Sequence, residues 1–267
     1  MIVTQKEQYP FGYTAITEQN GKHAEMLLDF GILRLEKGQA WESKKSKERA
    51  WLLIKGEVVF HWENQEATGS RFSCFDENPI VLHVPEGLPV IITAVEESEL
   101  AVEMVNNNNT FEPKFYKGDD TRCDIFGKGT LNEASIRTVR TVFDGESAPK
   151  SNMVLGEVIN HPGKWSSFPP HDHPQPEIYH YRLFPEQGFG ISLLGEEPHI
   201  VKNRYTSLIR QDITHSQAAS PGYAMYYIWM IPHLPEDRWL PTTRYYVKDH
   251  EWLLGKDVAI WPERNFK

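Results

Sequence analysis

The sequence contains only two cysteines, Cys74 and Cys123, among its 267 residues. Two cysteines this far apart cannot build a disulfide framework or a cysteine-rich metal site. The N-terminal stretch MIVTQKEQYPFGYTA has no charged region followed by an apolar core, so we expect no signal peptide. These features favour a cytoplasmic protein with two ordinary thiols.

Basic residues are in short supply as well. Lysine and arginine number 28 against 37 aspartates and glutamates, which gives a net charge of -9. A nucleic-acid partner would need a basic face or stripe, so none is expected. Apolar runs such as AWLLI (50–54) are broken within a few residues and the mean hydropathy is -0.51, so we expect no membrane span. A small organic substrate, anionic or neutral, remains open as a partner if basic residues converge locally.

Helical periodicity is scarce, whereas short segments rich in Val, Ile, Tyr, Trp and Phe recur between Gly, Pro, Asn and Asp. This pattern predicts an all-β protein. We expect strands at 26–36, 50–62, 79–85, 89–96, 99–105, 135–143, 152–160, 177–184, 188–195, 205–210 and 223–231.

A shift in composition at NNNNT (106–110) indicates a linker between two halves of similar strand content. We therefore expect two β-sandwich or barrel domains, residues 1–115 and 116–267. Eight of the 11 histidines lie beyond residue 150, so the second domain is where chemistry is expected.

The segment HDHPQPE (171–177) concentrates residues of the kind that bind metals. His171 and His173 are two positions apart, so both imidazoles point to one face of an extended segment, and Glu177 follows at the start of a strand. His215, in QDITHSQ, is a plausible fourth ligand. An isolated H-x-H pair is often only a solvated loop. The glutamate and the later histidine favour a site for a divalent first-row metal.

The same residues resemble the sequence motifs of the cupin superfamily, whose members are double-stranded β-helix barrels that hold one metal. Longer stretches resemble the 5-deoxy-glucuronate isomerase family of myo-inositol catabolism: RFSCFDENPIVLHVPEG (71–87), GEVINHPGKWSSFPPHDH (156–173), EIYHYRLFPEQGFG (177–190), PGYAMYYIWMI (221–231) and DHEWLL (249–254). The resemblance implies a bicupin with two jelly-roll barrels in tandem. Only the second barrel would carry the metal set.

The resemblance also implies a reaction. Such an enzyme would convert 5-deoxy-D-glucuronate to 5-dehydro-2-deoxy-D-gluconate through a cis-enediolate whose charge a divalent metal stabilises. Nitrogen and oxygen ligands do not decide between Zn, Mn and Fe.

A general base must move a proton between C2 and C1. The candidates are Tyr179 and Tyr181, which share a face with Glu177, together with Glu157 and a metal-bound hydroxide. Basic side chains are the candidates for binding the far carboxylate of the substrate: Lys164, Arg182, Lys202 and Arg244. Arg182 ranks last among them because its side chain should point to the face opposite to that of Glu177.

Three alternatives stay open. The segment GEEPHIVKN (195–203) is similar to a stretch of the 5-keto-4-deoxyuronate isomerase of pectin breakdown, which favours a pectin-derived or other uronate. The barrel could also bind a sugar acid without catalysis, as a sensor or storage domain. A His and carboxylate set would suit an Fe(II) dioxygenase too. Exposed strand edges and many aromatic residues favour a homo-oligomer.

Overall fold

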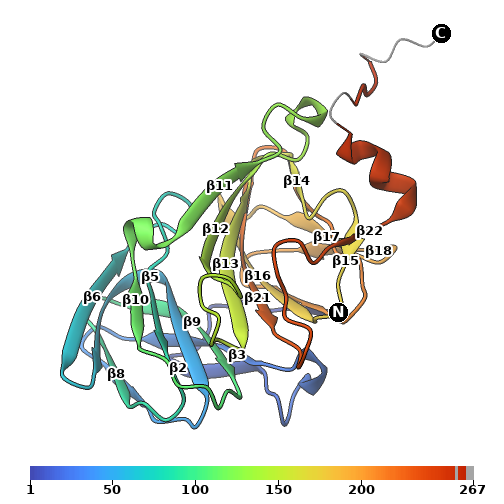
Figure 1. The fold of residues 1–267 in the computed structure, drawn as a ribbon. Helices are drawn as coiled ribbons and strands as arrows, with labels where there is room; N and C mark the ends of the chain where they lie inside the picture. Colours follow the sequence, from blue (N-terminus) through green and yellow to red (C-terminus); the bar gives the residue numbers. More distant parts are fainter. Residues whose placement is uncertain (256–257, 263–267) are drawn as a thin grey trace.

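The computed structural model describes residues 1–255 and 258–262 of the chain. Two β-barrels lie side by side, the first built mostly from the blue and cyan strands of Figure 1 and the second mostly from the green to red ones. No helix within the described residues is long and apolar enough to cross a membrane. The few helical turns are short 3-10 segments at Ala24–Met26, Gly118–Asp120, Leu131–Glu133 and Lys248–Leu254.

The first barrel is a strongly bent antiparallel sheet in which the long strand β5 (Glu48–Trp62) pairs with four neighbours. Its main strand order is β10-β7-β5-β9-β3-β2, and β4, β6 and β8 branch from it. The other strands of this barrel are β2 (Gly12–Thr17), β3 (Asp29–Leu35), β4 (Ala40–Ser43), β6 (Gln65–Arg71), β7 (Val81–Val84), β8 (Val90–Ala94), β9 (Ser98–Val105) and β10 (Lys114–Tyr116).

The second barrel combines three sheets with the orders β1-β19-β16-β21-β13-β12-β11, β14-β20-β17-β18 and β15-β22. Its first strand comes from the N-terminus of the chain, which lies beside the yellow and orange strands in Figure 1. The strands are β1 (Ile2–Val3), β11 (Arg122–Phe126), β12 (Arg137–Phe143), β13 (Met153–Asn160), β14 (Trp165–Ser166), β15 (His171–Asp172), β16 (Glu177–Phe184), β17 (Gly190–Leu194), β18 (Glu197–Val201), β19 (Thr206–Ile209), β20 (Gln217–Ala219), β21 (Ala224–Pro232) and β22 (Tyr245–Tyr246).

Three hydrophobic cores follow from the two-residue period of the strands. In β5, Leu52 and Ile54 belong to a core shared by the two barrels, whereas Trp51 and Leu53 fill the interior of the first barrel. Because successive side chains of a strand point to opposite faces, one strand can contribute side chains to two cores. The same alternation in β16 and β21 separates the shared core from the interior of the second barrel.

A buried ionic contact joins the two barrels beside this shared core. Arg71 of β6 donates two hydrogen bonds to Glu157 of β13, from Nη1 at 2.6 Å and from Nη2 at 2.9 Å. Neither side chain is exposed to solvent. The segment 106–110, expected as a linker, forms a further contact between the barrels, since the buried Asn107 amide donates to Glu48 and to the carbonyl of Lys150.

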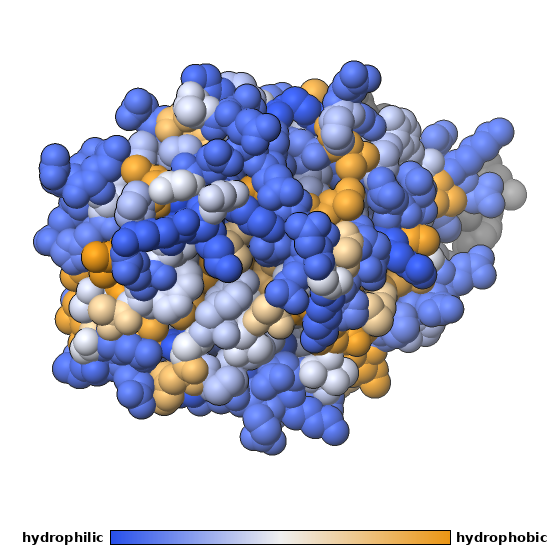
Figure 2. Space-filling model, turned by 90° about the horizontal axis from the view of Figure 1, so that it is seen from below, coloured by the Kyte–Doolittle hydropathy of each residue, from blue (hydrophilic) through white to orange (hydrophobic). Residues whose placement is uncertain are grey.

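All eleven segments expected as strands contain one, so that prediction is confirmed. The strands that were not expected are mostly short or polar, such as β6 with the sequence QEATGSR. Figure 2 shows one face of the molecule, where hydrophilic side chains predominate and hydrophobic ones gather only in small groups between them.

Candidate metal centre and active-site cavity

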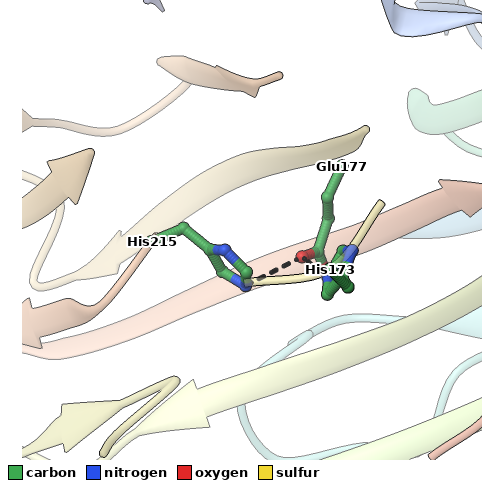
Figure 3. A group of neighbouring side chains, drawn as sticks. All are labelled: His173, Glu177 and His215. Atoms are coloured by element: carbon green, nitrogen blue, oxygen red, sulfur yellow. Dashed lines mark hydrogen bonds and ion pairs between the residues drawn. The ribbon is translucent and has the colours of Figure 1, made fainter. Parts of the chain in front are cut away.

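Three segments of the second barrel bring ligand-type side chains together. His171 lies in β15, His173 follows it, and Glu177 opens β16 after the turn Pro174–Pro176, while His215 lies between β19 and β20. Figure 3 shows His173, Glu177 and His215 pointing toward one another. Glu177 points into the barrel because it lies two residues before Tyr179 on the same strand, and Tyr179 belongs to the core inside the barrel.

The geometry of this cluster is tight. Glu177 Oε2 lies 3.3 Å from His173 Nε2 and 3.2 Å from His215 Nε2. His171 stands beside them, with its ring centroid 5.2 Å from that of His215. All four side chains are buried. The structure therefore assembles the four residues that the sequence singles out as metal ligands, with three of them in direct mutual reach.

The backbone fixes the tautomer of each imidazole. The Nδ1 atoms of His171, His173 and His215 lie 2.9, 3.0 and 2.9 Å from the carbonyl oxygens of Pro169, Gln175 and Ile213, respectively. A carbonyl oxygen only accepts hydrogen bonds, so each Nδ1 carries the proton and donates it. In a neutral ring the lone pair is then on Nε2, the atom that in His173 and His215 lies against Glu177.

Burial keeps two of these rings neutral. It lowers the pKa of His171 to about 3, with His215 as a second cause, and it also lowers the pKa of His215. The neutral Nε2 lone pair of His215 therefore faces the Glu177 carboxylate, an arrangement that a cation between them would stabilise.

The distances agree with a metal centre. Metal–nitrogen and metal–oxygen bonds of about 2.0–2.2 Å place neighbouring ligand atoms about 2.8–3.6 Å apart in octahedral or tetrahedral geometry. The separations of 3.2 and 3.3 Å from Glu177 Oε2 fall within this interval. The residues present thus fit a divalent first-row metal, while their nitrogen and oxygen donors leave its identity open.

A cavity of about 80 Å³ opens beside the cluster. Tyr179 and Tyr227 contribute hydroxyl groups to its wall, each held by a neighbouring serine: Tyr179 by Ser167 at 3.1 Å and Tyr227 by Ser166 at 2.7 Å. Burial raises the pKa of Tyr227 to about 12 and that of Tyr179 well above 10, where Glu177 adds to the effect. Both phenols are therefore protonated at neutral pH and offer hydrogen-bond donors to a bound molecule.

The other two predicted catalytic candidates lie away from this cavity. Tyr181 shares the barrel interior, but its hydroxyl is hydrogen-bonded to Ser207 and Gln217, and the residue is not part of the cavity wall. Glu157 points to the opposite face of its strand, where Arg71 and the hydroxyl of Tyr226 hold it. Of the three side-chain candidates, only Tyr179 lines the cavity beside the His and Glu cluster.

The predicted carboxylate-binding residues are also spread out. Arg182 is buried between the barrels, where it bonds to Glu99 and His180. Lys164 and Lys202 do not line the cavity, and Lys202 is exposed. Arg244 does line it, together with Tyr246. The opposite parity of Arg182 and Glu177 is thus reflected in their positions.

Several residues of the cavity wall were not singled out from the sequence. Ser166 and Ser167 stand in the WSSFPP stretch and Tyr227 in YAMYYIWMI, so a motif contained each of them without indicating a role. Arg137 also lines the cavity. It opens β12 in a segment that resembles no ligand motif, so no sequence signal pointed to it.

Two tandem barrels with a His and Glu cluster inside the second define a bicupin. The solved structures that resemble the chain support this class: an IolB-like protein from Salmonella typhimurium LT2 has a TM-score of 0.85 at 21% identity, covering 95% of this chain and 99% of that one. A putative glyoxylate-induced protein from Pseudomonas aeruginosa has a TM-score of 0.65 at 12% identity, covering 89% and 86%.

A family model described as the KduI/IolB family matches residues 2–253. The chain belongs to the KduI/IolB family, which confirms the resemblance seen in the sequence. The 5-deoxy-glucuronate isomerase of Geobacillus thermodenitrificans is 27% identical over 252 residues, covering 86% of this chain and 87% of the relative. The enzyme of the same name from Bacillus subtilis strain 168 is 24% identical over 248 residues, covering 86% and 88%. These relatives mark the chain as an enzyme of the isomerase class.

Proposed function

We propose that this protein is a metal-dependent aldose-ketose isomerase that converts 5-deoxy-D-glucuronate to 5-dehydro-2-deoxy-D-gluconate in myo-inositol catabolism. Two findings support the proposal: relatives of almost the same length carry the name 5-deoxy-glucuronate isomerase, and the second barrel holds a donor set suited to a divalent cation. We also propose the whole predicted ligand set, His171, His173, Glu177 and His215.

The reaction moves two hydrogens and leaves the overall oxidation state unchanged. The proton on C2 is removed, the C1 carbon receives a proton, and the hydroxyl proton of O2 is replaced by one on O1. Between these steps negative charge develops on the two oxygens, and preorganised positive charge or hydrogen-bond donors lower its energy. A divalent metal held by the four ligands would supply that charge as a Lewis acid.

The tyrosines of the wall have a defined part in this chemistry. Because the pKa of Tyr179 lies well above 10, its hydroxyl holds a proton and can donate it to an oxygen of the substrate. Ser167, 3.1 Å away, orients that hydroxyl, and Tyr227 lies beside it with ring centroids 4.3 Å apart. We therefore propose Tyr179 as the proton donor to the developing oxyanion.

One observation carries the proposal. Three histidines donate Nδ1–H to backbone carbonyls, which leaves each Nε2 able to bind a metal, and they lie with a carboxylate beside a cavity wall that contains tyrosine and serine hydroxyl groups. The test is a proton NMR time course of metal-replete protein with 5-deoxy-D-glucuronate in deuterated water. Loss of the aldehyde hydrate signals, growth of a ketose and deuterium at C1 are expected. His215→Ala protein serves as the inactive control.

A silent spectrum from protein with a full metal site would remove this substrate, and a pectin-derived keto-deoxyuronate would be tested next. The segment GEEPH that favoured such a uronate in the sequence forms edge strand β18 and does not line the cavity, so the structure adds no support for it. Oxygen uptake measured in the same samples would identify a dioxygenase instead.

Two further expectations are part of the proposal. We infer a cytoplasmic location because the exposed Cys123 is a free thiol, which suits a reducing compartment. We also keep the homo-oligomer as a prediction, which light scattering of the purified protein would test.

A further inference from the structure

Two arginines from distant segments meet at the outer end of the active-site cavity. Arg137 opens β12, and Arg244 directly precedes β22. Both line the metal cavity and also a neighbouring outer cavity of about 410 Å³. Phe168 and Tyr246 are the other residues that line both. These four side chains therefore stand where the inner and outer cavities adjoin.

Neither arginine has an acidic partner within the described part of the chain. Two buried guanidinium groups between the barrels are paired with a carboxylate, Arg71 with Glu157 and Arg182 with Glu99. The side chain of Arg137, by contrast, donates only to the carbonyl oxygen of Ser135. In a chain with a net charge of -9, two guanidinium groups that form no ion pair with a described carboxylate stand at one cavity, and they form a local site for an anion.

The size of the inner cavity shows how a substrate must lie. Its volume is about 80 Å³, whereas an engineered protein cavity known to bind one benzene molecule, which is smaller than a sugar acid, measures about 150 Å³. A six-carbon sugar acid therefore cannot fit inside the inner cavity alone. With its reacting end at the His and Glu cluster, its chain must extend past Arg137 and Arg244 into the outer cavity.

Both arginines stand on elements fixed relative to the metal ligands. Arg137 belongs to the central sheet through pairing with Asn160 of β13. Arg244 lies two residues before Tyr246, whose backbone pairs with that of His171. An anion bound by both would therefore be held at a set distance from the ligand cluster.

We propose that Arg137 and Arg244 together bind the terminal carboxylate of the sugar-acid substrate and select it over the corresponding neutral sugar. Planar guanidinium forks recognise carboxylates through paired hydrogen bonds, and here they would act at the end of the substrate opposite to the reacting aldehyde. This inference rests on the proposed function and deepens it, because it assigns the recognition of the acid to two residues.

The test compares the acid with its neutral analogue, 5-deoxy-D-glucose, in which a hydroxymethyl group replaces the carboxylate. In Arg137→Gln and Arg244→Gln we expect kcat/KM for the acid to fall about 10- to 100-fold, as for loss of a charged hydrogen bond, with kcat/KM for the analogue and the metal content unchanged. Arg210→Gln is the matched control, since Arg210 is an exposed arginine of the same barrel that lines neither cavity. If Arg137→Gln does not fold, Arg137→Lys takes its place, because lysine keeps the positive charge but lacks the planar guanidinium group that binds a carboxylate through paired hydrogen bonds.

Calorimetric binding of D-glucuronate and D-glucose to the same metal-replete proteins separates this inference from the proposed reaction. If wild-type protein prefers glucuronate and both arginine variants lose the preference, the inference holds even where no isomerisation occurs. An equal loss for acid and neutral ligand, or a preference that survives both substitutions, would overturn it.

Discussion

His215 Nε2 lies 3.2 Å from Glu177 Oε2, although one residue begins β16 and the other lies in the loop between β19 and β20. A proton shared between the two does not account for this contact. Nδ1 of His215 donates to the carbonyl of Ile213, and burial lowers the pKa of the ring, so Nε2 holds a lone pair at neutral pH. A lone pair directed at a carboxylate is stabilised when a cation lies between them.

The first prediction concerns this donor set. In His171→Ala and His215→Ala we expect bound metal and isomerase activity to be lost together, while the β-sheet circular dichroism spectrum is retained, because three barrel cores remain intact. Metal content is measured by elemental analysis after dialysis. His61→Ala, at a partly exposed histidine of the first barrel, is the control. Full metal content in both active-site variants would refute the ligand assignment.

The second prediction separates stability from catalysis at Glu157. Its carboxylate accepts two hydrogen bonds from Arg71 in the other barrel and one from Tyr226, with no exposure to solvent. Glu157→Gln leaves a buried guanidinium without its counter-charge, so we expect the free energy of unfolding to fall by about 3–5 kcal/mol. Metal content should not change.

Chemical denaturation followed by fluorescence measures this loss. Glu186→Gln is the matched control. The Glu186 side chain is 77% exposed and its ion pair with Arg204 is long, at 3.9 Å, so its removal should change stability by less than about 0.5 kcal/mol. A Glu157→Gln protein of normal stability but without turnover would restore Glu157 as a catalytic residue.

The strands and the alternation of β16 could be predicted from the sequence because both depend on a local two-residue period. That Glu177 and Tyr179 share one face of the strand and His180 lies on the other follows from that period alone. The ligand segment could be predicted because its donors are concentrated in a few positions, and His215 could be added as a histidine near a later strand.

The position of Glu157 could not be predicted in this way. Strand β13 is buried on both faces, with Leu155 in the shared core and Val154 in the interior of the second barrel. Parity divides such a strand into two faces but does not say which one is inside. Arg137 was missed for a related reason: the role of a lone arginine depends on Arg244, which only the tertiary fold brings to the same cavity.

The third prediction uses the close approach of Gly156 to Trp229. A Cβ atom at position 156 would lie 2.5 Å from the indole ring, which lines the active-site cavity. In Gly156→Ala the indole must move, so we expect kcat/KM to fall about 10-fold and stability to fall by about 1–3 kcal/mol. Adding Trp229→Phe makes room for the methyl group and should restore part of both losses. Losses that simply add in the double variant would show that the two residues do not clash.

The fourth prediction tests Tyr179 as the proton donor. Tyr179→Phe removes only the hydroxyl that Ser167 holds at 3.1 Å, so we expect kcat to fall about 10²- to 10⁴-fold with little change in KM and with normal metal content. Tyr181→Phe is the comparison on the same strand and face. Its hydroxyl is already satisfied by Ser207 and Gln217 outside the cavity wall, so kcat should stay near the wild-type value. Steady-state kinetics of the two variants side by side decide between the tyrosines: equal losses would mean that hydroxyl groups throughout the barrel support the site, and a larger loss in Tyr181→Phe would reverse the assignment.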